Sequence, residues 1–310
     1  MAGQLTSPQA TGGAGMVFEY RVAAIMLSRL IRGATVPVGT QLPIFRVGFQ
    51  QRNAGYALDD IVAHLLPRGD SPPPRVQFQA KKRIGITIQD REFCKVMAAA
   101  VQTYREHAAE FQSGHLLLGL AVGESATAHA DLDDLVHLTE MARADDGLEE
   151  FKLQLRKSVT RERRRTLYDI ISTAVAAAAA SSDTSVIDYL SHQILSSLHI
   201  WHVRADDDGK DWRAELDGLS GIAAQAGLAA PDLMGHLYSL ATFFDKHGGL
   251  VSAQHVHRQL LSLFGVDVAL PARGLVPRIP GINVTSYGNG PMFVAENQVF
   301  YGSHFSPNPG

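Results

Sequence analysis

The sequence has very little cysteine: Cys94 is the single cysteine among 310 residues. One thiol excludes an intramolecular disulfide and a zinc site built from several cysteines, and it suits a reducing compartment. No apolar run approaches the roughly 18 residues that span a bilayer, and residues 1–15 lack the basic and apolar regions of a secretory signal. The sequence therefore predicts a soluble, cytoplasmic protein with no membrane partner.

The chain also lacks an excess of positive charge, with 28 Lys and Arg against 31 Asp and Glu. This balance excludes a general polycation, so any contact with nucleic acid must come from a local basic face. The nucleotide-binding pattern GxxxxGK[ST] and the hydrolase patterns GxSxG and HExxH are missing as well. Hydrophobic residues make up 45% of the chain, enough for a sizeable core.

The first part of the chain alternates between helical and strand-like patterns. The predicted elements, in chain order, are a helix, three strands, a helix and a strand, at residues 16–31, 44–49, 58–65, 75–82, 87–111 and 115–123. Thr87 and Asp90 are both candidates for the cap of the second helix. The strand at 115–123 is apolar throughout, which is typical of a strand buried on both faces.

After about residue 124 the pattern becomes helical. The predicted helices lie at residues 131–143, 147–158, 160–180, 184–198, 231–247 and 252–264. We therefore expect a flexible lead at residues 1–15, an α/β core at residues 16–128, a mostly α-helical domain at residues 129–265, and a short strand-like connector at residues 266–310.

Three polar residues on two neighbouring predicted strands, Asp60, Gln79 and Lys81, are candidates for a catalytic site. Asp60 opens one apolar strand, and Gln79 and Lys81 lie on one face of the next, because residues i and i+2 of a strand share a face. If the two strands form a hairpin, Asp60 approaches that pair. Asp60 and the Gln79 amide oxygen suit Mg²⁺ or Mn²⁺, and Lys81 could steady developing negative charge or position a water during phosphodiester cleavage.

Glu19 adds a second carboxylate. It belongs to the first predicted helix, where Ala23, Met26 and Leu30 continue the same apolar stripe. A carboxylate in such a stripe is costly unless a cation or hydrogen bonds compensate it, so Glu19 is a further candidate metal ligand. Pairing with Arg21 or with another arginine in the core is an equally simple explanation.

With these residues the chain resembles the restriction-endonuclease-like PD-(D/E)xK nuclease superfamily, whose core order is helix, three strands, helix, strand. More narrowly, GGAGMVFEY, ALDDIV and QFQAKK look like the double-strand DNA nuclease domains that act as effectors in bacterial anti-phage systems. The resemblance implies an α/β fold, metal binding by Asp60, a site completed by Gln79 and Lys81, and a role for Glu19 as the helix acid. The superfamily more often carries Glu or Asp at the position of Gln79.

Alternatives remain at several of these positions. Asp59 competes with Asp60 as the ligand, and both could simply belong to a turn. Gln79 and Lys81 could instead face solvent at a sheet edge. Lys82 and Arg83 are as well explained by a solvated edge as by a rim that contacts DNA phosphates.

Other polar clusters are better explained by structure. His199 and His202 are spaced to share a helix face, but no carboxylate accompanies them. The arginine run at residues 161–165 is better explained as the solvated start of a helix than as a contact to DNA phosphates. Cys94 is expected in the core.

The resemblance also suggests partners. Related nuclease domains are joined to a sensor or NTPase module, and none is recognisable in this sequence. We therefore expect a Mg²⁺-dependent endonuclease for double-stranded DNA that works with a sensor module or partner subunit and forms homo-oligomers. The alternative is a catalytically silent nuclease-fold subunit that binds DNA or serves as a scaffold.

Overall fold

A computed structural model describes most of the chain. The described residues are 8–50, 57–58, 60–67, 72–123, 129–144, 147–157, 161–270, 293–295 and 298–300. The chain divides into two compact units, residues 1–271 and 272–310. In the second unit, β7 (Phe293–Ala295) and β8 (Gln298–Phe300) form a small antiparallel sheet.

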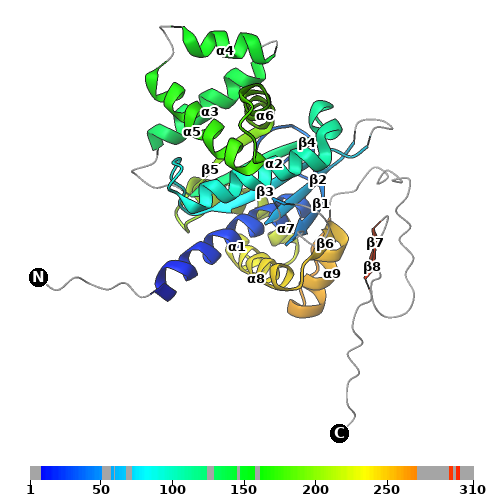
Figure 1. Cartoon of the computed structure of the whole chain (residues 1–310). Coiled ribbons are helices and arrows are strands. Elements are labelled where there is room, and N and C mark those ends of the chain that lie inside the picture. The colour runs from blue at the N-terminus through cyan, green and yellow to red at the C-terminus, as the bar shows by residue number, and fades with distance from the viewer. Residues whose placement is uncertain are drawn as a thin grey trace, which may run out of the picture. The chain divides into compact units, whose positions relative to one another are not determined.

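The first unit is built on a six-stranded mixed sheet (Figure 1). Its strands are β1 (Ile44–Phe49), β2 (Ile61–Leu65), β3 (Arg75–Lys81), β4 (Leu116–Gly123), β5 (Leu198–Val203) and β6 (Gly249–Ser252). They lie in the order β5-β4-β3-β2-β1-β6. Strands β3, β4 and β5 are parallel, whereas β2, β1 and β6 each pair antiparallel with the preceding neighbour.

Helices cover both faces of this sheet (Figure 1). One face packs against α1 (Pro8–Arg32), α7 (Lys210–Gln225), α8 (Ala230–His247) and α9 (Ala253–Phe264). The other packs against α2 (Arg91–Gln112), α3 (His129–Ala144), α5 (Glu162–Ala179) and α6 (Thr184–Ser197), and α4 (Leu148–Arg156) packs on this helical layer. Each face therefore has its own hydrophobic core.

The alternation along β3 places its side chains as the sequence predicts. Val76, Phe78 and Ala80 are fully buried in the core shared with α1, α7, α8 and α9. Gly119 of β4 lies opposite Phe78, and a Cβ atom there would approach the Phe78 ring to 2.3 Å. The close contact explains why the apolar β4 contains a glycine at this point.

The predicted division into an α/β core followed by a mostly helical domain is wrong. The second half of the chain adds β5 next to β4 and β6 next to β1, so both edges of the sheet come from residues beyond 128. In addition, α7, α8 and α9 pack on the same sheet face as α1. Residues 16–123 do contain the predicted order of helix, three strands, helix and strand.

Some elements differ from their predicted positions. Helix α1 begins at Pro8, ahead of the predicted start at Met16. The segment 198–203 is the strand β5 rather than part of a helical region, and α7 was not predicted. Within the described residues, no single helix is both long and apolar enough to cross a membrane, although α5 and α6, bent by 110° at a short break, pass that test as a pair.

Candidate active site

Asp60 and Gln79 meet where β2 begins and β3 ends. Ile61 pairs with Phe78 in the antiparallel ladder, which brings Asp60 beside Gln79 and Ala80. The Asp60 carboxylate accepts a hydrogen bond from the Ala80 backbone N–H (2.9 Å) and another from the Gln79 amide nitrogen. The Asp60 side chain is only 14% exposed, so these two bonds fix its orientation.

Lys81 brings a positive charge to the same place. Its Nζ lies 3.9 Å from Asp60 Oδ2, 4.0 Å from Glu19 Oε1 of α1, and 3.5 Å from Glu92 Oε2 of α2. The side chain is 18% exposed, so the ammonium is held among three carboxylates from different parts of the chain. The structure thus brings together all four residues that the sequence singled out: Glu19, Asp60, Gln79 and Lys81.

Glu19 lies in an environment that disfavours its charge. Burial, followed by the nearby Asp60 carboxylate, raises the pKa of Glu19 to about 7, although Lys81 acts in the opposite direction. The α1 stripe that contains Glu19 is buried against the sheet. Lys81 lies 4.0 Å away and offsets only part of the cost of burying the charged carboxylate. This local excess of negative charge is a property that a bound cation would relieve.

Glu92 is the residue of the site that sequence reasoning missed. It lies in the first turn of α2, where the Asp90 carboxylate caps the helix by accepting from the Glu92 and Phe93 backbone N–H groups at 2.9 and 3.0 Å. Asp90 also accepts from the Gly85 N–H (2.6 Å), which ties the β3–α2 loop to the helix start. A hydrogen bond from Lys95 is the main reason that the pKa of Glu92 is lowered.

The donor atoms fit an oxygen-ligated divalent cation. Glu19 and Asp60 offer carboxylate oxygens, and Gln79 offers an amide oxygen once its amide rotates to face an ion with Oε1 instead of Nε2. Within the part of the chain that the structure describes, no three His, Cys, Asp or Glu side chains converge closely enough to hold a metal. A metal here therefore needs Gln79 or water to complete its ligands.

The predicted basic rim follows β3 directly. Lys82 and Arg83 are both exposed, on the loop that leads from the site to α2. Their position next to Lys81 leaves them available to an anionic substrate. The alternative ligand Asp59 lies outside the described residues.

The remaining candidates have structural roles. Arg163 forms an ion pair with Asp131 (2.5 Å), and Arg164 forms one with Asp134 (2.9 Å), so the arginine run joins α5 to α3. His199 and His202 lie on β5, where residues three apart point to opposite faces and cannot share an ion.

His199 and Cys94 differ in how deeply they are buried. Burial and the nearby Arg143 lower the pKa of His199 to about 4, so it is neutral near pH 7. Cys94, expected in the core, is only half-buried and donates to the Ile88 carbonyl at 3.4 Å.

Comparisons with known proteins give little further information. No protein-family model and no curated protein matches the sequence. Among solved structures, the chain is similar to a Cap4 SAVED/CARF-domain containing receptor of Moraxella osloensis, with 12% sequence identity and a TM-score of 0.38. The similarity covers 80% of this chain and 48% of that receptor, so the chain spans about half of the receptor's length.

Proposed function

We propose that this chain is a Mg²⁺- or Mn²⁺-dependent endonuclease that hydrolyses phosphodiester bonds in double-stranded DNA. The observation that carries the proposal is the convergence of Asp60, Gln79 and Lys81 with Glu19 at one end of β2 and β3. The two carboxylates and the amide can supply oxygen ligands to a hard cation, and the ammonium group supplies a positive charge beside it, which together suit metal-assisted hydrolysis of a phosphodiester.

Each residue has a distinct part in this proposal. Asp60, oriented by the Ala80 N–H, and Glu19 would hold the cation together with the Gln79 amide oxygen. When bound, the cation would stabilise negative charge on the phosphate as a Lewis acid. Lys81 keeps a positive charge within 4.0 Å of both carboxylates, where it can position a water or stabilise the charge that develops during cleavage.

Glu92 has a supporting part. It lies 3.5 Å from Lys81 Nζ and approaches from α2, on the side opposite to α1 and Glu19. It therefore directs the lysine side chain without being a member of the ligand set. Lys95 holds the other oxygen of Glu92 at 2.7 Å, which fixes the carboxylate that faces Lys81.

The proposed substrate follows from charge. Lys82 and Arg83 add two exposed positive charges directly after Lys81, on a chain whose formal net charge is -3. Binding of DNA through such a local rim should weaken steeply as salt increases, with a slope that scales with the number of phosphates neutralised. Binding that is insensitive to salt would contradict this substrate.

We also propose that the nuclease acts in bacterial anti-phage defence, with a sensor module or partner subunit and through homo-oligomers. This part of the proposal is supported by the sequence resemblance of GGAGMVFEY, ALDDIV and QFQAKK to effector nuclease domains. It predicts that cleavage increases when the protein assembles. Chromatography and plasmid cleavage over the same concentration series test that link.

The test of the nuclease itself is plasmid cleavage with and without Mg²⁺. Asp60→Ala removes a proposed ligand and Lys81→Ala removes the positive charge, so each should reduce the rate by ~10²-fold or more. Glu106→Gln, an exposed change on α2 away from the site, is the matched control and should cleave at the wild-type rate. If the wild-type protein binds DNA without cleaving it, the silent DNA-binding alternative is correct.

A further inference from the structure

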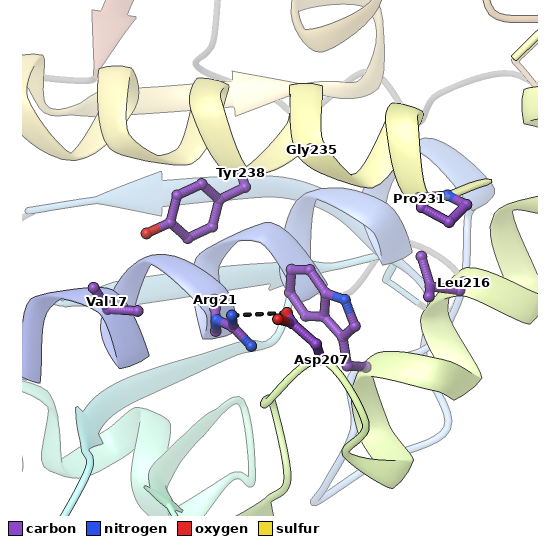
Figure 2. Close-up of a pocket in the computed structure, with 8 residues that line it drawn as sticks. Val17, Arg21, Asp207, Leu216, Pro231, Gly235 and Tyr238 are labelled. Atoms are coloured by element: carbon purple, nitrogen blue, oxygen red, sulfur yellow. Dashed lines mark hydrogen bonds and ion pairs between the residues drawn. The ribbon is translucent and has the colours of Figure 1, made fainter. Parts of the chain in front are cut away.

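A concave site lies between α1, α7 and α8, and none of its lining residues belongs to the candidate active site. Its cavity has a volume of about 550 Å³, within the range of small-molecule sites. The lining residues are Val17, Arg21, Asp207, Trp212, Leu216, Pro231, Gly235 and Tyr238. Figure 2 shows Arg21 of α1 and Tyr238 of α8 on facing sides of this space.

The walls are largely aromatic and aliphatic, and the two charged lining residues, Arg21 and Asp207, form an ion pair. Arg21 is 20% exposed, and its guanidinium carbon lies 5.1 Å from the centroid of the Trp212 ring. One of its nitrogens donates to the Ala205 carbonyl, which fixes the direction of the side chain. The guanidinium group is therefore preorganised beside an aromatic face.

The counterion of Arg21 is weakly held. Arg21 Nη2 donates to Asp207 Oδ1 at 2.8 Å (Figure 2), but the Asp207 side chain is 86% exposed. An ion pair with such an exposed carboxylate contributes little free energy, because water solvates the acid almost equally well without its partner. Another anion that enters the cavity can replace Asp207 at Arg21.

We propose that this cavity binds a small molecule that carries a flat ring and an anionic group. The ring would stack on Trp212 or Tyr238, and the carboxylate or phosphate would take the place of Asp207 at Arg21. The inference is independent of the proposed nuclease activity, because none of the lining residues belongs to the active site. We call this cavity the Arg21 pocket.

Gly235 provides a clean way to block the Arg21 pocket. It is an exposed residue of α8, and a Cβ atom added there meets no other atom within 4 Å. The Cβ of a leucine at this position, which lines the cavity, therefore meets no other atom, and the rest of the side chain adds bulk at the cavity wall. Gly221 of α7 is also exposed and equally unobstructed, but it does not line the pocket, so Gly221→Leu is the matched control.

The test is a titration of the full chain with phenyl phosphate, benzoate and neutral benzyl alcohol, followed by tryptophan fluorescence and calorimetry. The chain has two tryptophans; Trp201 is buried against Phe78, so Trp212 is the one that a ligand can quench. Both anions should bind with a Kd of about 1 mM or below, the range open to fragments of this size. Benzyl alcohol should bind ~10-fold more weakly.

The variants should change the affinity for the two anions in opposite directions. Arg21→Met should weaken both anions by ~10-fold, whereas Asp207→Asn should strengthen them several-fold because it removes the competing carboxylate. Gly235→Leu should abolish quenching and Gly221→Leu should leave it unchanged. Tighter binding of phenyl phosphate indicates a phosphate ligand, and tighter binding of benzoate indicates a carboxylate.

Three results would overturn the proposal. One is the absence of saturable binding of either anion up to about 10 mM. Another is equal affinity for benzyl alcohol and the anions. The third is wild-type binding by the Gly235→Leu protein.

Discussion

Gln79 is the residue that sets the charge of the candidate active site. It is a neutral amide, and in the structure its nitrogen donates to Asp60. The site therefore contains one ligand that contributes no negative charge and one hydrogen bond that holds Asp60 when no cation is present. Both properties would change if a carboxylate replaced the amide.

Gln79→Glu should strengthen Mg²⁺ binding and weaken the metal-free protein. The new carboxylate adds a hard oxygen ligand, so we expect Kd for Mg²⁺ to fall by ~10-fold. Without metal, repulsion from Asp60 and loss of the donated hydrogen bond should lower the Tm. Thermal melts with and without Mg²⁺ measure both effects, with Gln225→Glu at the exposed end of α7 as the control. A wild-type response to Mg²⁺ would mean that Gln79 is not a ligand.

Glu19 makes stability depend on pH in a direction opposite to that of most carboxylates. Because burial raises its pKa to about 7 in the folded state, the folded protein holds a proton that the unfolded chain has released above pH ~4.5. Stability contributed by protonated Glu19 should therefore be lost as pH rises from about 4.5 to about 7, in buffer without metal.

Glu19→Gln should remove this loss. The variant should be more stable than wild type by about 1–3 kcal/mol at pH 7 and equally stable near pH 4, since wild-type Glu19 is then neutral. Urea titrations at both pH values measure the difference. Addition of Mg²⁺ should stabilise the wild-type protein more than the Glu19→Gln protein. A larger gain in stability for Glu19→Gln would exclude Glu19 as a ligand.

At the scale of residues, the sequence predicted four members of the site and missed Glu92. Asp60, Gln79 and Lys81 were predictable, because strand alternation and a hairpin place them by local rules. Glu92 was not, since its position depends on where α2 starts and on how Asp90 binds Gly85 of the preceding loop. The structure does not compare Asp59 with Asp60 as the metal ligand, because Asp59 lies outside the described residues.

At the scale of elements, α1 and α7 are joined by a buried charge cluster. Glu215 of α7 is 1% exposed and forms ion pairs with Arg29 and Arg32 of α1, with Arg29 Nε at 2.8 Å. Ser28 donates to the same carboxylate at 2.8 Å. One acid therefore satisfies three donors from a single helix.

Glu215→Ala should destabilise the fold by about 3–5 kcal/mol, because it leaves two largely buried guanidinium groups without their acid. The control is Asp207→Ala, which removes the ion pair between Arg21 of α1 and the exposed Asp207 of the β5–α7 loop. This change should cost less than about 1 kcal/mol. Chemical denaturation of both variants compares them. Equal losses would show that burial of Glu215 does not determine the strength of the cluster.

The two strands that the sequence missed, β5 and β6, depend on partners far away in the chain. Segment 198–203 follows α6 without a break and contains Leu, Ile, Trp and Val, so its local pattern does not mark where the helix ends. Its strand conformation comes from pairing with β4, a contact about 80 residues away in the chain. β6 has four residues, too few for an alternating pattern, and it depends in the same way on β1.

At the scale of the whole molecule, the first compact unit cannot be divided at residue 128. Strand β4 would lose its neighbour β5, and the core on α1 would lose α7, α8 and α9. A fragment of residues 1–128 should therefore fail to melt cooperatively, whereas residues 1–271, which keep all six strands and both cores, should melt cooperatively. Circular dichroism during heating compares the two fragments. A cooperative melt of residues 1–128 would restore an independent N-terminal domain.

The two edge strands also set the order of events during synthesis. Strands β1 to β4 are complete by residue 123, but β6, which covers the edge of β1, emerges only at residues 249–252. At about 5–20 residues per second, the ribosome needs on the order of 6–25 s for that interval. Throughout that time β1 stays an unpaired edge of the nascent sheet, and β4 stays one until β5 emerges at residues 198–203. Such unpaired edges are the kind of surface that pairs with other chains. Chaperone binding to the nascent chain should accordingly be strongest between the emergence of β4 and that of β6.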